Sequence, residues 1–322
     1  MEREEQAYWL LLTFKSGLSY RIIHTIIEQW CIQRKRTLQA FFAADSHEWT
    51  TICHLNEKTV TQLDQAKGQL AEQRAVVEKL ATHFSMMTVL DAHYPRLLKE
   101  TLPTAYLPPV LFYKGNVQLL NRTTIALIGS RKATEHSLAF THVAASYLAE
   151  RGVNIISGFA HGVDHTAYEG ATSVDGCTTI VLPNGIYGVN KPQMTEISTN
   201  VEKGNVLLLS QFHPEASWLV NRAMARNKVV TGLAQIVIVA ESSMLGGTWD
   251  AANGALAQRR PLYVCHVVDA EPLPGNVALV ERGGRSLYWS ATEAKGRSMT
   301  EVVLSPLLEE SNRLRQRHEY VS

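Results

Sequence analysis

From residue 123 the sequence reads TTIALIGSR, in which the apolar run Ile125–Ile128 is closed by Gly129 and Ser130. The same pattern, a short apolar run bounded by glycine or serine, returns at intervals that leave room for a helix. The further runs are Val153–Ile156, Thr179–Leu182, Val206–Leu209, Ile236–Val239 and Leu262–Val264. Short, fully apolar runs rich in β-branched residues are typical of strands buried on both faces of a parallel sheet. We therefore predict an α/β fold with a doubly wound, Rossmann-like parallel sheet.

The segments on either side of these runs indicate the domain organisation. In residues 1–90, apolar residues recur at helical spacing, which predicts a small helical domain. Residues 91–120 contain several prolines and the run Val110–Tyr113, and we expect an extended connector with one short strand. We assign residues 121–290 to the sheet domain and residues 291–322 to a C-terminal helical tail.

The composition is that of an ordinary globular protein. Of 322 residues, 45% are hydrophobic and 19% are charged, and the net charge of +1 gives no global attraction to nucleic acid or to an anionic membrane. Any anion-binding site must therefore be local. The N-terminus opens with acids and no stretch approaches the roughly 20 apolar residues of a membrane span, so we expect a cytoplasmic protein without membrane contact. The cysteines are too far apart for a zinc site and are expected to be small buried hydrophobes: Cys31, Cys53, Cys177 and Cys265.

In a doubly wound fold, right-handed crossovers bring the loops after the strands to one edge of the sheet, where ligands bind. The first such loop is Gly129-Ser130-Arg131-Lys132. Glycine lets the backbone approach a phosphate, serine can cap the next helix, and arginine can donate two hydrogen bonds to phosphate oxygens. The loop is not a GxGxxG dinucleotide motif. The alternative interpretation is a helix cap with a surface arginine.

The loop after the second run reads SGFAHGVD and contains Gly158 and Gly162, which suit a tight turn or the close approach of a ligand. Asp164 follows at the start of a helix, where the simpler explanation is an acid that complements the helix dipole. His161 and His165 have no third metal ligand nearby, so we expect no metal site.

Residues 217–231 form a basic segment without a single acid. Its cations are Arg222, Arg226 and Lys228. Arg222 and Arg226 are four residues apart and share a face on a helix. Trp218 and Phe212 are close in sequence, and cations combined with stacking rings are what a single strand of nucleic acid requires. The alternative is a solvated helix face with buried aromatic rings.

The loop after the fifth run contains Gly246-Gly247-Thr248 ahead of an alanine-rich helix, an arrangement that can hold an anion at the helix N-terminus. The sequence has no P-loop, no HExxH and no Ser-His-Asp spacing. We therefore expect no catalytic residues and no cofactor.

Taken in order, these loops resemble the DprA/Smf family of DNA-processing proteins. The resemblance runs from about Tyr8 to about Leu287 and rests on pieces that are weak singly and specific together. These are Asp91, Tyr94, Pro95 and Leu98; Pro108-Pro109, Leu111-Phe112 and Gly115-Asn116; Gly129-Ser130-Arg131; Ser157–Asp164; Arg226-Asn227-Lys228 and Thr231-Gly232-Leu233; Glu241-Ser242-Ser243; and Gly246-Gly247-Thr248.

The resemblance implies a homodimeric single-stranded DNA-binding protein that protects DNA and loads a RecA-type recombinase, in transformation, recombination or phage defence. It also implies that the helical N-terminus is a SAM-like domain. The tail is too short for the winged-helix domain of some members. Family members usually carry Phe-Pro where Ala223-Met224 stand, so Phe212 and Trp218 are the base-stacking candidates. The phosphate-binding candidates, from loops and resemblance together, are Gly129, Ser130, Arg131, Lys132, Gly158, Gly162, Arg222, Arg226, Asn227, Lys228, Gly246, Gly247 and Thr248.

Two other functions remain open at this stage. The chain also resembles the lysine-decarboxylase-like nucleoside-monophosphate hydrolases, and a nucleotide-binding sensor or hydrolase is the main alternative. Ala251 stands where those enzymes carry a functional glutamate, which removes the obvious acid. A scaffold that binds protein partners is the second alternative. Because the cations are local, we expect a narrow single strand at one sheet edge and little affinity for duplex.

Overall fold

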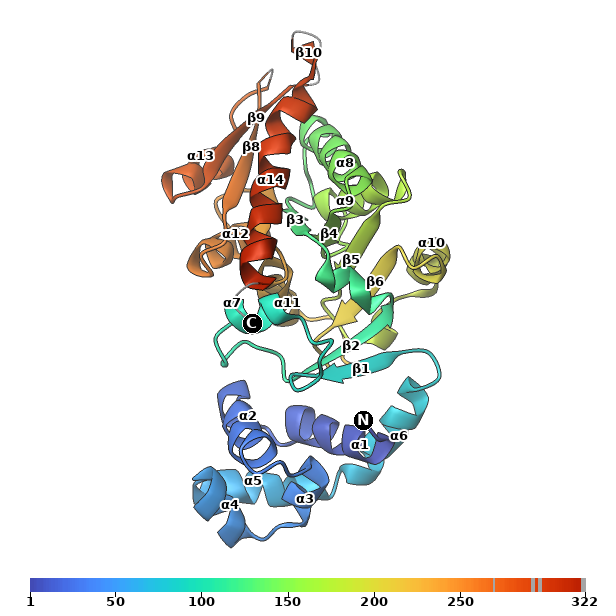
Figure 1. The fold of residues 1–322 in the computed structure, drawn as a ribbon, viewed down its shortest axis with the longest axis vertical. Coiled ribbons are helices and arrows are strands. Elements are labelled where there is room, and N and C mark those ends of the chain that lie inside the picture. The colour runs from blue at the N-terminus through green and yellow to red at the C-terminus, as the bar shows by residue number, and fades with distance from the viewer. Residues whose placement is uncertain (269, 291–292, 295–296, 320–322) are drawn as a thin grey trace.

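In the computed structural model the six apolar runs lie within one nine-stranded sheet, with helices on both faces (Figure 1). The structure describes residues 1–268, 270–290, 293–294 and 297–319. The strands of the sheet are β1 Ser85–Thr88, β2 Val110–Gly115, β3 Thr124–Ile128, β4 Asn154–Ser157, β5 Cys177–Val181, β6 Val206–Ser210, β7 Ile236–Val239, β8 Leu262–Val267 and β9 Arg285–Trp289. In a separate two-stranded sheet, β10 Glu293–Ala294 pairs antiparallel with β11 Arg297–Ser298.

The helices fall into an N-terminal group and a group that alternates with the strands. The first group is α1 Arg3–Leu10, α2 Tyr20–Ile26, α3 Leu38–Ala43, α4 Ser46–Cys53, α5 Glu57–Lys67 and α6 Leu70–Leu80, with π-helical turns at Leu11–Lys15 and Ile27–Ile32. The second group is α7 Arg96–Thr101, α8 Glu135–Glu150, α9 Val163–Thr172, α10 Lys191–Glu202, α11 Val220–Gly232, α12 Gly247–Ala257, α13 Pro274–Glu281 and α14 Met299–Glu319. Short 3₁₀ turns lie at Val117–Asn121 and Ile186–Gly188.

The strand order confirms the predicted doubly wound α/β fold. It runs β1-β2-β6-β5-β4-β3-β7-β8-β9, and every pair from β6 to β9 is parallel. Ile125 on β3 pairs with Ile155 on β4 and with Ile236 on β7. The chain therefore winds outward from β3 in both directions, and the topological switch point lies between β3 and β7.

The edge strands differ from the sequence-based prediction. β1 pairs antiparallel with β2, and β2 pairs antiparallel with β6. β1 lies within residues 1–90, predicted to be helical. β2 confirms the short strand predicted within the connector, and both segments contribute to the sheet. The reason is packing, because Leu111 and Phe112 are fully buried. β9, which the sequence analysis did not identify, forms the opposite edge.

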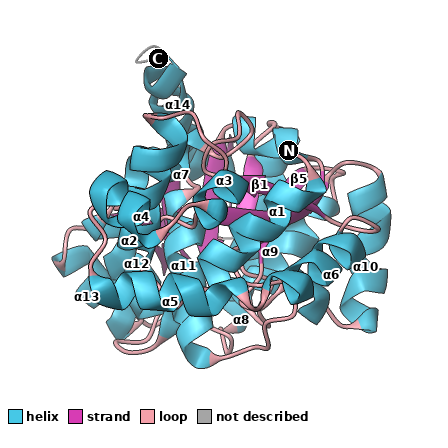
Figure 2. Ribbon diagram, turned by 90° about the horizontal axis from the view of Figure 1, so that it is seen from below, coloured by secondary structure: helices cyan, strands magenta, loops and turns pink. Residues whose placement is uncertain are grey.

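Two apolar layers enclose the sheet. Four helices pack their apolar sides against one face of the sheet, namely α7, α11, α12 and α13. Their buried residues include Val229, Ala252 and Leu279. On the other face, α8, α9 and α14 pack their apolar sides, including Phe140 and Leu304. In the view from below, helices lie on both sides of the strands (Figure 2). The predicted tail, residues 291–322, is helical over α14. The prediction is wrong for β10 and β11, which pair as strands, and part of residues 291–322 lies outside the described residues.

The N-terminal helices cover one end of the sheet, at the foot of Figure 1. Their aromatic core contains Trp30, Phe41 and Trp49, with Trp49 donating its indole N–H to the Phe41 carbonyl at 2.8 Å. The same apolar cluster continues into the sheet through Phe112 and Leu208. The helical part therefore shares a core with β2 and β6.

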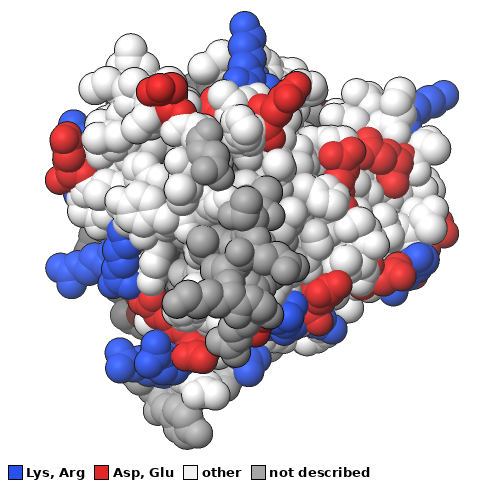
Figure 3. Space-filling model, turned by 90° about the horizontal axis from the view of Figure 1, so that it is seen from above, with Lys and Arg blue, Asp and Glu red and all other residues white. Residues whose placement is uncertain are grey.

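The surface charge is mixed. On the face shown in Figure 3, Lys and Arg side chains lie beside Asp and Glu, so this face carries no extended field of one sign. Within the described ranges, no helix is long and apolar enough to cross a membrane.

Candidate nucleic-acid interface

One cavity at the carboxyl edge lies at the switch point of the sheet, and we call it the main cavity because most of the predicted site residues line it. It has a volume of about 400 Å³ and is lined by the loops after β3, β4 and β7 and by the start of α11. Ten of the predicted site residues line it: Gly129, Ser130, Arg131, Gly158, Trp218, Arg226, Asn227, Gly246, Gly247 and Thr248. The parallel topology thus brings together loops that are far apart in the sequence.

The loop after β3 is held by the end of β7. The Ser130 amide donates to the Glu241 carbonyl at 2.9 Å, and the Glu241 carboxylate accepts hydrogen bonds from the Thr134 amide and hydroxyl at 2.8 and 2.9 Å. Thr134 is the N-cap of α8. These bonds fix both ends of the turn that carries Arg131, whose side chain is exposed at the cavity rim.

Two glycines let the loops after β3 and β4 meet. Gly162 has a φ of +83°, and a Cβ there would lie 2.4 Å from the Ser130 carbonyl oxygen. A Cβ on Gly129 would lie 2.5 Å from the Val163 side chain. Glycine is therefore required at both positions for this close packing. Gly162 supports the loop that carries Arg131 and does not itself line the main cavity.

Arg226 lies at the base of the cavity with only 4% of its surface exposed. Its Nη1 donates to the Gly158 carbonyl at 2.8 Å and to the Val181 carbonyl at 2.6 Å, and its Nε donates to the Asn227 side chain. The Gly158 amide donates to the Asp164 carboxylate at 3.1 Å. Burial raises the pKa of Asp164, and the Arg226 charge opposes that shift. The Gly158 peptide is therefore held between a buried acid and a buried arginine.

A second cavity of about 360 Å³ adjoins the first at the ends of β4 and β5. The two cavities share Arg131, Gly158, Ala160, Trp218 and Arg226. Trp218 stands at their junction with 48% of its surface exposed. We call the two cavities together the switch-point groove.

The loop before α12 completes the main cavity. Gly246 has a φ of +93°, and a Cβ there would meet open space. The Asn227 side chain donates to the Gly247 carbonyl at 3.1 Å, which joins this loop to α11. The first residues of α12, Gly247 and Thr248, face the same space as Arg131.

The structure separates the remaining predicted residues from the groove. Arg222 donates to the Ser217 carbonyl at 2.5 Å and lines a different cavity, together with Phe212. The Lys228 ammonium lies 4.7 Å from the centre of the Tyr106 ring. Lys132 is exposed and lines neither cavity of the groove. The cations of residues 217–231 therefore do not form one basic face, since Arg226 turns into the protein.

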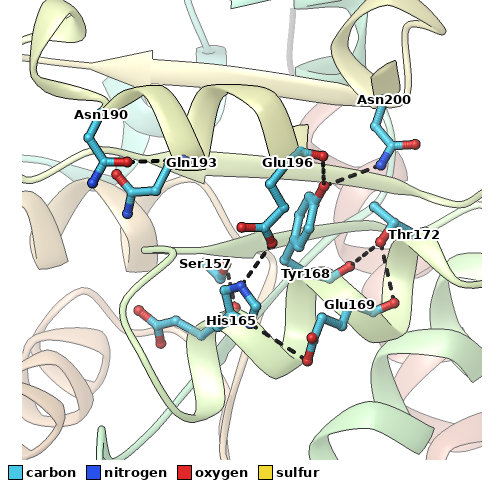
Figure 4. A network of polar contacts seen from close by, with 10 residues as sticks. Ser157, His165, Tyr168, Glu169, Thr172, Asn190, Gln193, Glu196 and Asn200 are labelled. Carbon is cyan, nitrogen blue, oxygen red and sulfur yellow. Dashed lines mark hydrogen bonds and ion pairs between the residues drawn. The ribbon is translucent and has the colours of Figure 1, made fainter. Parts of the chain in front are cut away.

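The two histidines near the groove have other partners. His161 Nδ1 lies 3.0 Å from the Arg131 carbonyl. His165 Nε2 lies 2.8 Å from the Glu196 carboxylate and Nδ1 lies 3.6 Å from Glu169, in a network that ties α9 to α10 (Figure 4). Within the described part of the chain, no group of three or more His, Cys, Asp or Glu is placed to hold a metal ion.

Sequence reasoning missed an apolar rim on the main cavity. Val220 is 65% exposed and Leu245 is 81% exposed, and both line the cavity. The only signal in the sequence is that two apolar residues, Met244 and Leu245, stand in a loop between strand and helix. Exposure of such residues is a property of the folded chain, so the sequence alone does not reveal it.

The fold and site define the chain as a doubly wound α/β protein with a glycine-rich groove, containing two arginines, at its switch point. Residues 85–296 match the model of the family described as DNA recombination-mediator protein A. The chain belongs to this family, and the resemblance inferred from the loops is confirmed.

Curated relatives and solved structures agree with this assignment. The chain is 29% identical over 190 residues to protein Smf of Escherichia coli, and the match covers 59% of this chain and 48% of that protein. It is 31% identical over 180 residues to the DNA processing protein DprA of Streptococcus pneumoniae, covering 56% of this chain and 62% of that protein. The chain thus matches about half the length of the first relative and somewhat more of the second.

Among solved structures, the X-ray structure of the S. pneumoniae protein superposes with a TM-score of 0.71 and 25% identity, covering 87% of this chain and 94% of that chain. A DNA processing protein A of Helicobacter pylori, studied for its single-stranded DNA binding mode, superposes with a TM-score of 0.56 and 24% identity, covering 71% of this chain and 98% of that chain. The similarity to the H. pylori structure shows that the two proteins share a fold.

Proposed function

We propose that the chain binds single-stranded DNA in the switch-point groove, protects it and delivers it to a RecA-type recombinase. The observation that carries the proposal is the junction of the two cavities, where Arg131, Arg226 and the exposed Trp218 meet. Cations for phosphates and a ring for base stacking are the two features by which proteins bind single strands without reading their sequence. The single-stranded DNA binding studied in the H. pylori relative supports the proposal.

The two arginines have different tasks in this proposal. Arg131 is exposed on a turn fixed at both ends, so it pairs directly with a phosphate. Arg226 is buried, and its Nη1 already donates hydrogen bonds to two carbonyl oxygens. Its charge at the base of the cavity attracts the backbone of the strand, while Gly246 and Gly247 let that backbone come close.

The proposed role is binding rather than catalysis. Among the described residues that line the main cavity, Asp164 alone carries a carboxylate. That carboxylate already accepts a hydrogen bond from the Gly158 amide and lies near Arg226. Its part is to hold the loop, and we propose no proton transfer by it. The working form that we propose is a cytoplasmic homodimer, and light scattering of the purified chain measures its oligomeric state.

The test is competition between an unlabelled duplex and a fluorescent oligothymidine across a salt series. Affinity for the single strand should fall as salt rises, with a log–log slope of about −0.7 for each neutralised phosphate. Arg131→Ala should weaken binding about tenfold and make the slope shallower by about 0.7. Arg313→Ala, at an exposed arginine of α14 far from the groove, is the matched control.

Two outcomes would contradict the proposal. One is the absence of oligothymidine binding at low salt. The other is an Arg131→Ala variant that binds as tightly as the original chain. Lys228→Ala tests the prediction for that residue, and we expect a smaller loss because Lys228 lies over Tyr106.

Nucleotide binding is the second candidate, because the main cavity lies where doubly wound proteins bind nucleotides and includes the N-terminus of α12. Calorimetric titration with nucleoside monophosphates and cyclic nucleotides separates the two functions. Saturable micromolar binding of a nucleotide by a chain that does not bind DNA would favour the sensor.

A further inference from the structure

A different groove lies between the N-terminal helices and the loop after β6, outside the switch-point groove. Its cavity has a volume of about 330 Å³. The N-terminal helices contribute one wall, and the loop after β6 with the first turn of α11 contributes the other. The residues that matter here are Phe14, Lys15 and Tyr20 on the first wall and Phe212, His213 and Arg222 on the second. We call this cavity the helix–loop groove, and it contains two predicted site residues that the switch-point groove leaves out.

A π-helical turn forms the N-terminal wall of the helix–loop groove. In Leu11–Lys15 the Ser16 amide donates to the Leu11 carbonyl at 3.1 Å, a bond that spans five residues where an α-helix spans four. Leu11 is fully buried, whereas Phe14 and Lys15 line the groove. Turns of this kind are rare and often lie at functional sites. The turn therefore directs attention to the side chains that it places in the groove.

Aromatic rings line the helix–loop groove from both walls. The rings of Phe14 and His213 meet edge to face, with their centroids 5.6 Å apart. Nε2 of His213 lies 3.2 Å from the side-chain oxygen of Gln73, which holds the imidazole in place. Phe14, Tyr20 and Phe212 are half-buried, so part of each ring remains accessible. Accessible rings of this kind are the surfaces on which unpaired bases stack.

The helix–loop groove also carries one positive charge that no carboxylate neutralises. Of its other charged residues, Lys15 pairs with Glu72 at 2.8 Å, and Glu215 pairs with Lys79 at 3.1 Å. Within the described ranges Arg222 forms no ion pair, and only its Nη1 donates hydrogen bonds to other protein atoms. Its Nε and Nη2 are therefore available to a phosphate, to which an arginine can donate two parallel hydrogen bonds.

A short segment separates the helix–loop groove from the switch-point groove. His213 lines the first groove and Trp218 lines the second. The loop after β5 fixes this segment, because the Gly185 amide donates to the Ala216 carbonyl at 2.8 Å and a Cβ on Gly185 would lie 2.2 Å from the His213 carbonyl oxygen. A strand bound at Trp218 therefore needs only to cross this segment to reach Arg222.

We propose that the helix–loop groove binds a further nucleotide of the single strand, with the Arg222 guanidinium on its phosphate and the rings of Phe14 and Phe212 against its base. This inference rests on the proposed function and extends the DNA-binding surface to the N-terminal helices. A strand that fills only the switch-point groove does not reach this site. The contribution of the helix–loop groove is therefore confined to longer strands.

The experiment measures the affinity of the full chain for oligothymidines of increasing length by fluorescence anisotropy. Phe14→Leu, Phe212→Leu and Arg222→Ala should each weaken the binding of long strands, the ring variants by about fivefold or more, and leave the shortest strands that bind unchanged. Arg222→Ala should also make the salt slope of long strands shallower by about 0.7, and Arg222→Lys should restore that slope because the charge returns. Lys58→Ala, at an exposed lysine of α5 outside the groove, is the matched control.

The outcomes separate this inference from the proposed function. If no strand binds, the proposed function fails and this inference fails with it. If the variants weaken short and long strands to the same degree, or leave every affinity unchanged, DNA binding stands and the helix–loop groove is not a nucleotide site. If Arg222→Ala alone weakens the binding of long strands, the groove contacts a phosphate and the proposed base contact is overturned.

Discussion

At the scale of single residues, Gly158 shows how a missing side chain makes room for a charge. A Cβ at this position would lie 1.9 Å from Arg226 Nη1 and 2.4 Å from Cζ. The space that glycine leaves is filled by the guanidinium, which reaches the carbonyls of Gly158 and Val181. Because burial lowers the pKa of Arg226, these acceptors and Asp164 are needed to keep the buried cation stable.

Gly158→Ala is therefore expected to destabilise the protein by about 2–3 kcal/mol, since the new methyl displaces Arg226 and leaves buried carbonyls without a donor. Urea denaturation followed by circular dichroism measures the change. Gly254→Ala is the control: this glycine is inside α12, a Cβ there meets nothing within 4 Å, and the change should stabilise by up to about 1 kcal/mol. Equal effects of the two variants would refute the packing argument.

At the scale of elements, the end of β7 organises the start of α8. The backbone carbonyl of Glu241 accepts a hydrogen bond from the Ser130 amide. Its carboxylate accepts hydrogen bonds from the amide and the hydroxyl of Thr134. The carboxylate thereby complements the positive N-terminal end of a 16-residue helix. One residue that follows β7 thus positions the loop of Arg131 without lining the cavity.

Replacing Glu241 tests this coupling. Glu241→Ala should cost about 1–2 kcal/mol of folding free energy, as the loss of a helix cap usually does, and Glu241→Gln should recover part of it because an acceptor oxygen remains. Thermal unfolding of the three proteins measures the order of stability. If Gln and Ala destabilise equally, the carboxylate charge, and not its hydrogen bonds, is what α8 requires.

The success of the sequence-based prediction also varied by element. The sequence predicts strands β3 to β8 because each contains a run of mostly apolar residues, which follows from burial on both faces. The sequence does not reveal β1 and β9 because edge strands are partly exposed: Ser85 and Arg285, their first residues, are both exposed. Topology then placed the glycine-rich loops together. The direction of side chains on α11 could not be predicted, because the hole beside Gly158 that receives Arg226 exists only in the folded protein.

At the scale of the whole molecule, two histidines join the N-terminal helices to later parts of the chain. His24 of α2 lies 2.9 Å, through Nε2, from the carbonyl of Leu107 in the segment before β2. His213, in the loop after β6, lies 3.2 Å through Nε2 from the side chain of Gln73 on α6. Burial lowers the pKa of both histidines below the usual value, against smaller opposing contributions. Both rings are therefore neutral in the folded protein at neutral pH.

This arrangement predicts that the folded protein becomes less stable as the pH is lowered. Between the lowered pKa of the folded state and the ordinary value of about 6.5, the unfolded chain binds protons that the folded chain does not. Stability is therefore fully present above about pH 6.5 and is lost as pH falls below it, by at most about 1.4 kcal/mol per pH unit for each histidine. Urea midpoints at pH 7.5 and 5.5 measure the loss.

The variant that carries both His24→Gln and His213→Gln separates these two groups from all others. Glutamine keeps a hydrogen-bonding side chain and does not titrate, so the double variant should lose less stability between pH 7.5 and 5.5 than the original chain. His47→Gln, at an exposed histidine of α4 within the helical domain, is the control and should change nothing. A double variant with the same pH dependence as the original chain would show that carboxylates elsewhere account for the loss. The smaller dependence that we expect would show that these two neutral rings stabilise the contact between the N-terminal helices and the rest of the protein.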